Sequence, residues 1–409
     1  MKPTALPHPC DKPPPTAVAG SHTTLDPTLT PPNHTAPPSQ SLSSTAHLCT
    51  SPLTGCTPTP PKDPPVPSSQ PSQAISAGAA AASAVGDVTP ASMTRAALQS
   101  ARCSRPYMED RHTVVASLRL LSPAGLPLLD DGVQRSLAAV YDGHNGSRAA
   151  ELAASRLHLL LAADPALRYF TGDSKAERSS QELEESAVTG AMCRAFHSLD
   201  EAILAEARSE GLRDGATAVV VMRLGDVLYA AHAGDSRAVL CRQGGAAERL
   251  TEDHKPNLPG ERARVAAVGG RVEFQRCWRV ISEARGGRPG SGLAVSRSFG
   301  DIDFKEPQRM VECEPDVCRV VPRVGDPFVL LASDGLFDVL SDQEAVDCAD
   351  KALQGCIDTR RAAALESGGS AAPLRESEAR IVAEALLARA IAKGTMDNVT
   401  AVVMLLGWD

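Results

Sequence analysis

Five acidic segments of this chain place carboxylates beside glycine or small polar residues, at or near the ends of apolar, β-rich runs. A single Asp-Gly pair is usually a surface turn. Five such ends are harder to explain in that way, because crowded carboxylates repel one another and are costly to bury without cations between them. Oxygen ligands of this kind suit hard cations such as Mg²⁺ or Mn²⁺. The segments are Met108-Glu109-Asp110, Asp142-Gly143-His144, Gly234-Asp235-Ser236, Ser333-Asp334-Gly335 and Met396-Asp397-Asn398.

The segment A-V-Y-D-G-H-N-G at 139–146 shows the pattern most fully. A short apolar run ends at Asp142 and is followed at once by Gly143 and His144. Because glycine has no Cβ, its backbone carbonyl can approach a metal ion or the waters around it. A surface turn also uses Asp, Gly and Asn, and it remains the alternative for this segment taken alone. The pattern favours an active-site loop at the end of a buried strand.

Strand and helix patterns alternate in blocks from residue 96 onward, and these elements must position the acids. The strongest hairpin signal is Gly225-Asp226, which joins two β-rich runs. Because helices lie between blocks of strands rather than after every strand, we expect an α+β sandwich and not a doubly wound sheet. The β-rich runs are 111–118, 136–141, 216–224, 227–233, 238–242, 328–332 and 399–406. The helical patterns cover 147–162, 181–209, 259–268, 343–354 and 374–393.

Residues 1–95 differ in composition from the rest of the chain. They are rich in Pro, Ser, Thr and Ala, and the first aromatic residue is Tyr107. Such a segment has too little apolar surface to offset the entropy that ordering would cost. We therefore expect a disordered tail at 1–95, available to reach a partner or to carry phosphorylation. One folded domain would follow at 96–409, since about 310 residues can bury one large core.

Charge and hydropathy argue against several classes of protein. The formal net charge is −8 and no block of five Lys or Arg residues occurs, which argues against nucleic-acid binding. No apolar run reaches the ~18 residues of a membrane span. The 11 cysteines show no pairing rhythm, so we expect reduced thiols in an intracellular compartment, cytoplasmic or nuclear. An organelle address in the Ser- and Thr-rich tail is the alternative.

Eight segments in order along 105–400 resemble those of the metal-dependent Ser/Thr protein phosphatases of the protein phosphatase 2C type. Any one segment alone would be weak, but eight in the same order are specific, and they cover essentially the whole folded part. The segments are RPYMED at 105–110, VYDGHNG at 140–146, GATA at 215–218, AGDSR at 233–237, DHKP at 253–256, GLAVSRSFGD at 292–301, ASDGLFD at 332–338 and DNVT at 397–400.

The resemblance implies a central β-sandwich of two antiparallel sheets flanked by helices, with a binuclear Mg²⁺ or Mn²⁺ centre at one end. By motif position, Asp142 would bridge the two ions. Asp334 and Asp397 would complete the shell of one ion, and Glu109 with the Gly143 carbonyl would complete that of the other. No position in this set departs from the family's pattern, which disfavours an inactive pseudo-enzyme.

The resemblance also assigns a third, weaker metal position to Asp235 and Asp338, together with Asp334. Arg105 matches the arginine that holds the substrate phosphate, and its planar fork suits two phosphate oxygens. A hydroxide that bridges two divalent ions would attack phosphorus directly. His144 is the candidate general acid for the leaving serine or threonine oxygen. A role for His144 only in orienting a metal-bound water is the alternative.

These residues imply a protein serine/threonine phosphatase with phosphorylated proteins as substrates and a monomeric catalytic domain at 96–409. Two other classes remain open at this point: a non-catalytic domain that binds phosphoproteins, and a different two-metal hydrolase such as a nuclease. The complete carboxylate set opposes the first. The acidic charge balance opposes the second, because affinity for nucleic acid relies on Lys and Arg to neutralise phosphates.

Other polar and aromatic residues are expected to be structural. His254 in the DHKP segment is interpreted as structural, and Arg237 and Arg297 are expected to brace loops by pairing with acids. Trp278 lies where the family carries a variable flap. Packing of the flap is its simplest role, and recognition of a substrate or partner is the alternative. The glycine-rich segment 286–292 lacks the Lys-Ser/Thr ending of a P-loop and is expected to be a mobile loop.

Overall fold

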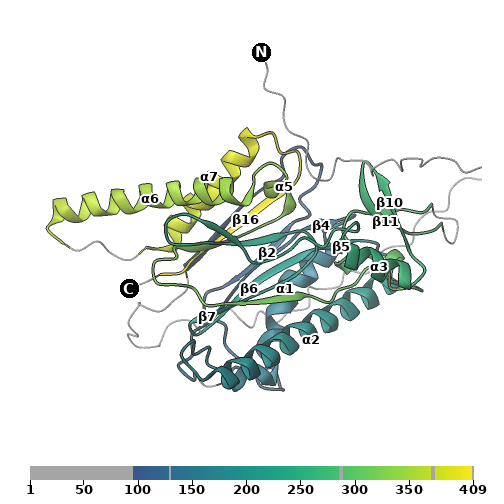
Figure 1. The fold of residues 1–409 in the computed structure, drawn as a ribbon, viewed down its shortest axis with the longest axis horizontal. Coiled ribbons are helices and arrows are strands. Elements are labelled where there is room, and N and C mark those ends of the chain that lie inside the picture. Colours follow the sequence, from purple (N-terminus) through teal and green to yellow (C-terminus); the bar gives the residue numbers. More distant parts are fainter. Residues whose placement is uncertain (1–94, 129, 285–288, 370–373, 408–409) are drawn as a thin grey trace, which may run out of the picture. The chain divides into compact units, whose positions relative to one another are not determined.

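The chain is described by a computed structural model, and the predicted tail lies almost entirely outside the described residues (Figure 1). The first strand begins at Arg95, so the proposed boundary at residue 96 remains a prediction. Residues 286–288 of the expected mobile loop also lie outside the described part. The described residues are 95–128, 130–284, 289–369 and 374–407.

Two five-stranded antiparallel sheets form the centre of the fold, which confirms the expected sandwich (Figure 1). One sheet has the order β1 (Arg95–Ala101), β16 (Val399–Leu405), β15 (Phe328–Ala332), β8 (Arg237–Cys241) and β9 (Ala247–Arg249). The other has the order β14 (Asp316–Val320), β7 (Val227–Ala233), β6 (Ala218–Leu224), β3 (Arg135–Tyr141) and β2 (Arg111–Val115). The predicted hairpin is formed by β6 and β7.

Most strands of the two sheets are buried on both faces. Successive side chains of a strand point to opposite faces of its sheet. In β3, Ala138 and Val140 belong to the apolar cluster between the sheets, whereas Leu137 packs toward the helices. In β15, Val329 and Leu331 face the same inter-sheet cluster. Burial on both faces explains why these strands read as continuous apolar runs in the sequence.

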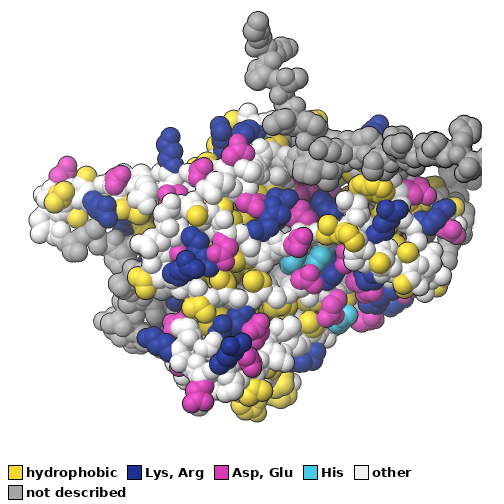
Figure 2. Space-filling model, viewed as in Figure 1, with side chains coloured by type: hydrophobic (Ala, Val, Ile, Leu, Met, Phe, Trp, Pro, Cys, Tyr) yellow, Lys and Arg dark blue, Asp and Glu magenta, His cyan; other side chains and the backbone are white. Residues whose placement is uncertain are grey.

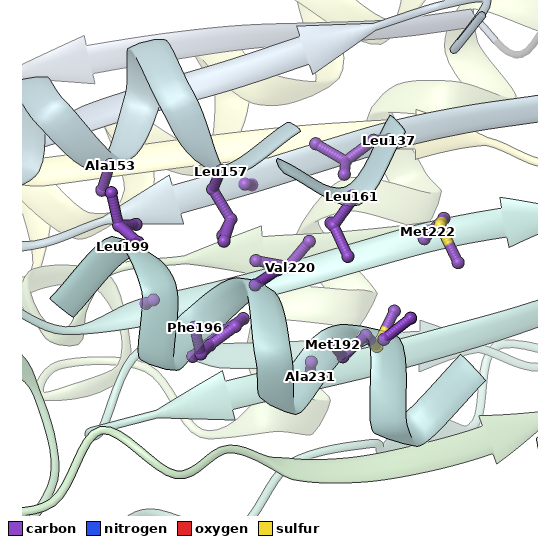
Figure 3. Packing of buried hydrophobic residues seen from close by; sticks show 14 of the residues in the cluster. Leu137, Ala153, Leu157, Leu161, Met192, Phe196, Leu199, Val220, Met222 and Ala231 are labelled. Atoms are coloured by element: carbon purple, nitrogen blue, oxygen red, sulfur yellow. The ribbon is translucent and has the colours of Figure 1, made fainter. Parts of the chain in front are cut away.

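Two pairs of helices cover the outer faces of the sandwich, one pair on each sheet (Figure 1). In one outer layer, Leu157 and Phe196 lie in a single cluster with Val220 of β6 (Figure 3). Full burial of such a side chain contributes about 1.5–3 kcal/mol to stability. These layers hold the strand ends, and the acids they carry, in fixed positions. The four helices are α1 (Arg148–Ala163), α2 (Arg178–Glu210), α6 (Asp342–Ser367) and α7 (Glu376–Ala392).

Shorter elements surround one end of the sandwich. A small sheet joins β13 (Phe299–Gly300), β5 (Gly215–Ala216) and β4 (Gly143–His144). A third sheet joins β10 (Arg271–Gln275), β11 (Cys277–Ile281) and β12 (Gly292–Leu293). The short helices are η3 (Pro165–Arg168), α3 (Pro259–Ala267), α4 (Ile302–Lys305) and α5 (Asp334–Phe337).

Among the elements that were predicted, α6 departs clearly from its expected bounds, because it continues to Ser367 instead of ending near residue 354. Gly355 does not end it, because one glycine inside a helix costs only about 1 kcal/mol and the residues that follow are good helix formers. The helix begins at the Ser341 capping box and ends at Gly368, which adopts a left-handed conformation with φ of 65°. The predicted strand at 111–118 is also shorter, because β2 ends at Val115.

Among the residues that the structure describes, no helix combines the length and the apolar character that crossing a membrane would require.

Candidate metal centre

The predicted acidic residues gather at one end of the sandwich. Glu109 precedes β2, Asp142 follows β3, Asp235 lies between β7 and β8, Asp334 follows β15, and Asp397 precedes β16. In an antiparallel sheet the end of one strand lies beside the start of its neighbour. The five positions therefore lie at the same end of the two sheets. Asp338 lies at the C-terminal end of α5, the short helix that follows β15. The structure therefore brings the predicted carboxylates together.

The acids at this end are crowded, and two of them, Asp110 and Asp235, are almost fully buried. Burial, followed by the negative charges of Asp334, Asp110 and Asp235, raises the pKa of Asp142 well above its ordinary value. Burial, followed by Asp235 and Asp338, does the same for Asp334. Burial also raises the pKa of Asp110 to about 6. The mutual repulsion of carboxylates crowded in this way is relieved by divalent cations, which are well suited to oxygen ligands.

Gly143 is required by the close approach of two chain segments. A Cβ at this position would lie 2.5 Å from the Glu109 carbonyl oxygen, so only glycine fits. The Glu109 carboxylate is fixed nearby, because Oε1 accepts a hydrogen bond of 2.7 Å from the Gly146 backbone N–H. This arrangement keeps the Glu109 side chain beside the Asp142 loop, as the predicted ligand set requires.

Asn398 joins the two loops that carry Glu109 and Asp397, and sequence reasoning did not single it out. Its Oδ1 accepts from the Glu109 backbone N–H at 2.8 Å. Its Nδ2 donates to the carbonyl oxygens of Tyr107 and Arg102 at 3.0 and 3.2 Å. The position of Asn398 directly after a predicted ligand is the only sequence signal for this role.

Arg105 contacts one of the predicted ligands, Asp397. Its Nη2 pairs with Asp397 Oδ2, and its side chain is 53% exposed. A half-exposed guanidinium keeps donors available to solvent and to an incoming anion. The structure thus places the predicted phosphate-holding arginine beside the predicted metal ligands.

His144 lies on β4 and contacts Asp301, a residue that sequence reasoning quoted in a motif but gave no role. His144 Nε2 lies 2.8 Å from Asp301 Oδ2, and Ser298 Oγ donates to the same oxygen at 2.6 Å. A Cβ on Gly215 would lie 2.1 Å from that oxygen, so a glycine is needed there. Burial lowers the pKa of His144, but the Asp301 charge and hydrogen bond outweigh it and leave the pKa above its ordinary value.

A second polar group, His232, His254 and Asp316, offers ligand atoms within 4.8 Å of one another. The two imidazole rings are stacked, with centroids 4.4 Å apart and planes inclined by 3°. Nitrogen lone pairs lie in the ring plane, so parallel rings do not point at a shared ion. His254 Nδ1 instead accepts from the Gly234 N–H at 3.1 Å, and His254 Nε2 lies 3.1 Å from Asp316 Oδ2. These contacts support the structural role expected for His254.

The two arginines that were expected to brace loops do so. Arg237 forms a two-pronged pair with Asp253, at 2.7 and 2.8 Å. Arg297 pairs with Glu261 and Asp316, each at 2.8 Å. These contacts hold the segments on either side of the acids.

The β10–β11 hairpin carries the aromatic residues of the expected flap. The Trp278 ring meets Phe274 edge-on, with centroids 5.5 Å apart, and the Arg262 guanidinium lies 5.6 Å from its centroid. These contacts agree with the packing role of Trp278. Its role in recognition remains a prediction. Figure 2 shows acidic and basic side chains interspersed over this face of the molecule.

Comparison with protein families gives a match to the protein phosphatase 2C family over residues 97–399. Human protein phosphatase 1F is 33% identical over 309 residues, which are 76% of this chain and 56% of that protein. The probable protein phosphatase 2C 8 of Oryza sativa is 36% identical over 268 residues, 65% of this chain and 61% of that protein. The chain thus spans little more than half the length of these two curated relatives.

Solved structures show the same fold. A serine-threonine phosphatase 2C from Toxoplasma gondii superimposes with a TM-score of 0.59 at 24% identity, covering 78% of this chain and 96% of that one. A sex-determining protein of C. elegans gives a TM-score of 0.56 at 22% identity, covering 76% of this chain and 65% of that one. At these identities the similarity establishes the sandwich architecture.

Proposed function

Because this chain belongs to the protein phosphatase 2C family, we propose that it hydrolyses phosphoserine and phosphothreonine in proteins with the help of Mg²⁺ or Mn²⁺. The observation that carries the proposal is the crowding of carboxylates at one end of the sandwich, where Asp110 and Asp235 are almost fully buried. The raised pKa values of Asp142 and Asp334, caused in part by neighbouring carboxylates, agree with a site whose charge is balanced by cations. The names of the relatives, several of which are called protein phosphatases, support the same reaction class.

The donors fit two hard divalent ions. Asp142 would lie between them, with Asp334 and Asp397 on one side and Glu109 with the Gly143 carbonyl on the other. Every donor is an oxygen, and the approach of Gly143 to Glu109 leaves no room for a side chain at that position. When bound, two such ions supply a water of lowered pKa and stabilise the charge that develops on phosphorus.

Arg105 and His144 would act on the substrate itself. The half-exposed Arg105 guanidinium can hold two phosphate oxygens in its planar fork, and its contact with Asp397 orients it toward the acids. His144, with its pKa raised by Asp301, is poised to carry the proton that the leaving serine or threonine oxygen needs. A positioned general acid contributes about 10²–10⁴ in rate.

The test is release of phosphate from a phosphothreonine protein by the full chain, with Mn²⁺ and Mg²⁺ titrated and a chelator as the blank. Asp142→Asn and Asp334→Asn should each abolish metal-dependent turnover. Asp358→Asn, an exposed carboxylate on α6, should keep it and is the matched control. Turnover that persists in the chelator, or in both site variants, would overturn the proposal.

A further inference from the structure

Lys255 places an ammonium group among the carboxylates of the candidate metal centre. Its Nζ donates to Asp235 Oδ2. The Asp235 side chain is 5% exposed and that of Lys255 is 25% exposed, so the pair is largely shielded from water. A lysine side chain is positively charged at neutral pH, and the charge of Lys255 acts on both Asp235 and Asp334. Lys255 is therefore a charged group close to two of the predicted metal ligands.

The position of Lys255 is fixed by the way its loop is joined to the Asp235 loop. The His254 backbone N–H donates to the Gly234 carbonyl at 2.9 Å, and the Gly234 N–H donates to His254 Nδ1 at 3.1 Å. The residue before Lys255 is thus bound twice to the residue before Asp235. This double connection sets the two side chains opposite each other.

Contacts on both sides of this connection prevent the loops from separating. Arg237 and Asp253 form their two-pronged pair directly beside it. The Ser296 backbone N–H and hydroxyl both donate to the His254 carbonyl, at 2.9 and 3.0 Å. Lys255 cannot withdraw with its loop, so its ammonium group stays near Asp235 unless the side chain itself swings away.

We propose that Lys255 is a resident cation of the third metal position and lowers the affinity of that position for a divalent ion. The proposal rests on the function proposed above, because it takes Asp235 as a ligand of a third ion. A single positive charge about 6 Å from a divalent ion weakens its binding by about tenfold, even at the dielectric constant of water. The two ions beside Asp142 have no such competitor in contact with their predicted ligands among the described residues, apart from Arg105 at Asp397.

The test counts the Mn²⁺ ions bound to the full chain, by electron paramagnetic resonance of free Mn²⁺ over micromolar to millimolar concentrations. For the wild type we expect two tight sites and one weak site. In Lys255→Met the third site should tighten by at least about tenfold, and by more than either of the first two sites, because Lys255 contacts Asp235 directly. Lys255→Arg should keep the weak third site, because it keeps the charge.

Two further variants complete the experiment. Lys351→Met removes an exposed lysine on α6, outside all the segments that carry the predicted ligands, and should bind as the wild type does. Lys255→Met combined with Asp235→Asn should lose the third site, which assigns the tightened site to Asp235. A third-site affinity that is unchanged or weaker in Lys255→Met, with the first two sites intact, would overturn the proposal. A wild type that binds no Mn²⁺ would instead overturn the proposed function, so the two failures are distinguishable.

Discussion

Replacing Asp110 by asparagine should stabilise the metal-free protein at neutral pH. The Asp110 carboxylate is buried in the group of acids, where its Oδ2 accepts from Ser333 Oγ at 2.9 Å and its Oδ1 has no partner among the described residues. Burial raises its pKa from the ordinary 3.8 to about 6. At 1.36 kcal/mol per pKa unit, this difference means that the ionised group costs the folded state up to about 3 kcal/mol.

The pH dependence follows from the direction of this pKa change. Below about pH 3 the carboxyl is protonated in both the folded and the unfolded chain, so it costs nothing. As the pH rises through 4 to 6 the unfolded chain releases the proton first, and the stability of the wild type falls. Asparagine carries no proton to lose, so the stability of Asp110→Asn should match that of the wild type near pH 3 and exceed it above pH 6.

Urea unfolding followed by circular dichroism, in a chelator at pH 3 and pH 7.5, measures this difference. We expect the free energy of unfolding of Asp110→Asn to exceed that of the wild type by about 1–3 kcal/mol at pH 7.5. Asp358→Asn on the exposed face of α6 is the control and should change neither value. A variant that is less stable than the wild type at pH 7.5, or equally stable, would refute the electrostatic account of this site.

Three further changes test other parts of the structure. Gly143→Ala should lose about 1–3 kcal/mol of stability and weaken Mn²⁺ binding, because its Cβ would overlap the Glu109 carbonyl. Urea unfolding and Mn²⁺ titration measure the two effects, and wild-type values in both would contradict the prediction. Asp301→Asn should lower kcat by about 10–100-fold and leave the Mn²⁺ affinity unchanged, because the contact that orients His144 is weakened. An unchanged kcat would remove His144 or Asp301 from the mechanism. Phe196→Ala should lower the free energy of unfolding in urea by about 3–5 kcal/mol, because the side chain is fully buried between α2 and the sheet. A loss below about 1 kcal/mol would mean that this layer packs differently.

The sequence allowed the acidic residues to be predicted because each has a local signature. An apolar run that ends in an acid beside a small residue is visible without knowledge of the fold, as at Asp142 and Asp334. The hairpin at Gly225 and the helices α1 and α2 are likewise encoded by short-range patterns. The inter-sheet core follows from the same runs, since strands buried on both faces are continuously apolar.

Other parts depend on partners that are distant in the chain. Residues 95–101 read R-A-A-L-Q-S-A, a composition that suits a helix, yet they form β1 because all seven pair with β16. Asp301 contacts His144 across 157 positions, and Lys255 contacts Asp235 across 20. Asn398 acquires its role from contacts with a loop nearly 300 residues earlier. No local pattern carries these contacts, so only the fold assigns them.

The most direct measurement of the central claim is anomalous diffraction from a crystal of the chain grown with Mn²⁺. The account predicts two strong anomalous peaks on either side of the Asp142 carboxylate, one beside Glu109 and one beside Asp334 and Asp397. The Asp142→Asn variant should lose at least one of them. Peaks that lie elsewhere, for example at His232 and His254, or no peak near Asp142 at millimolar Mn²⁺, would contradict it.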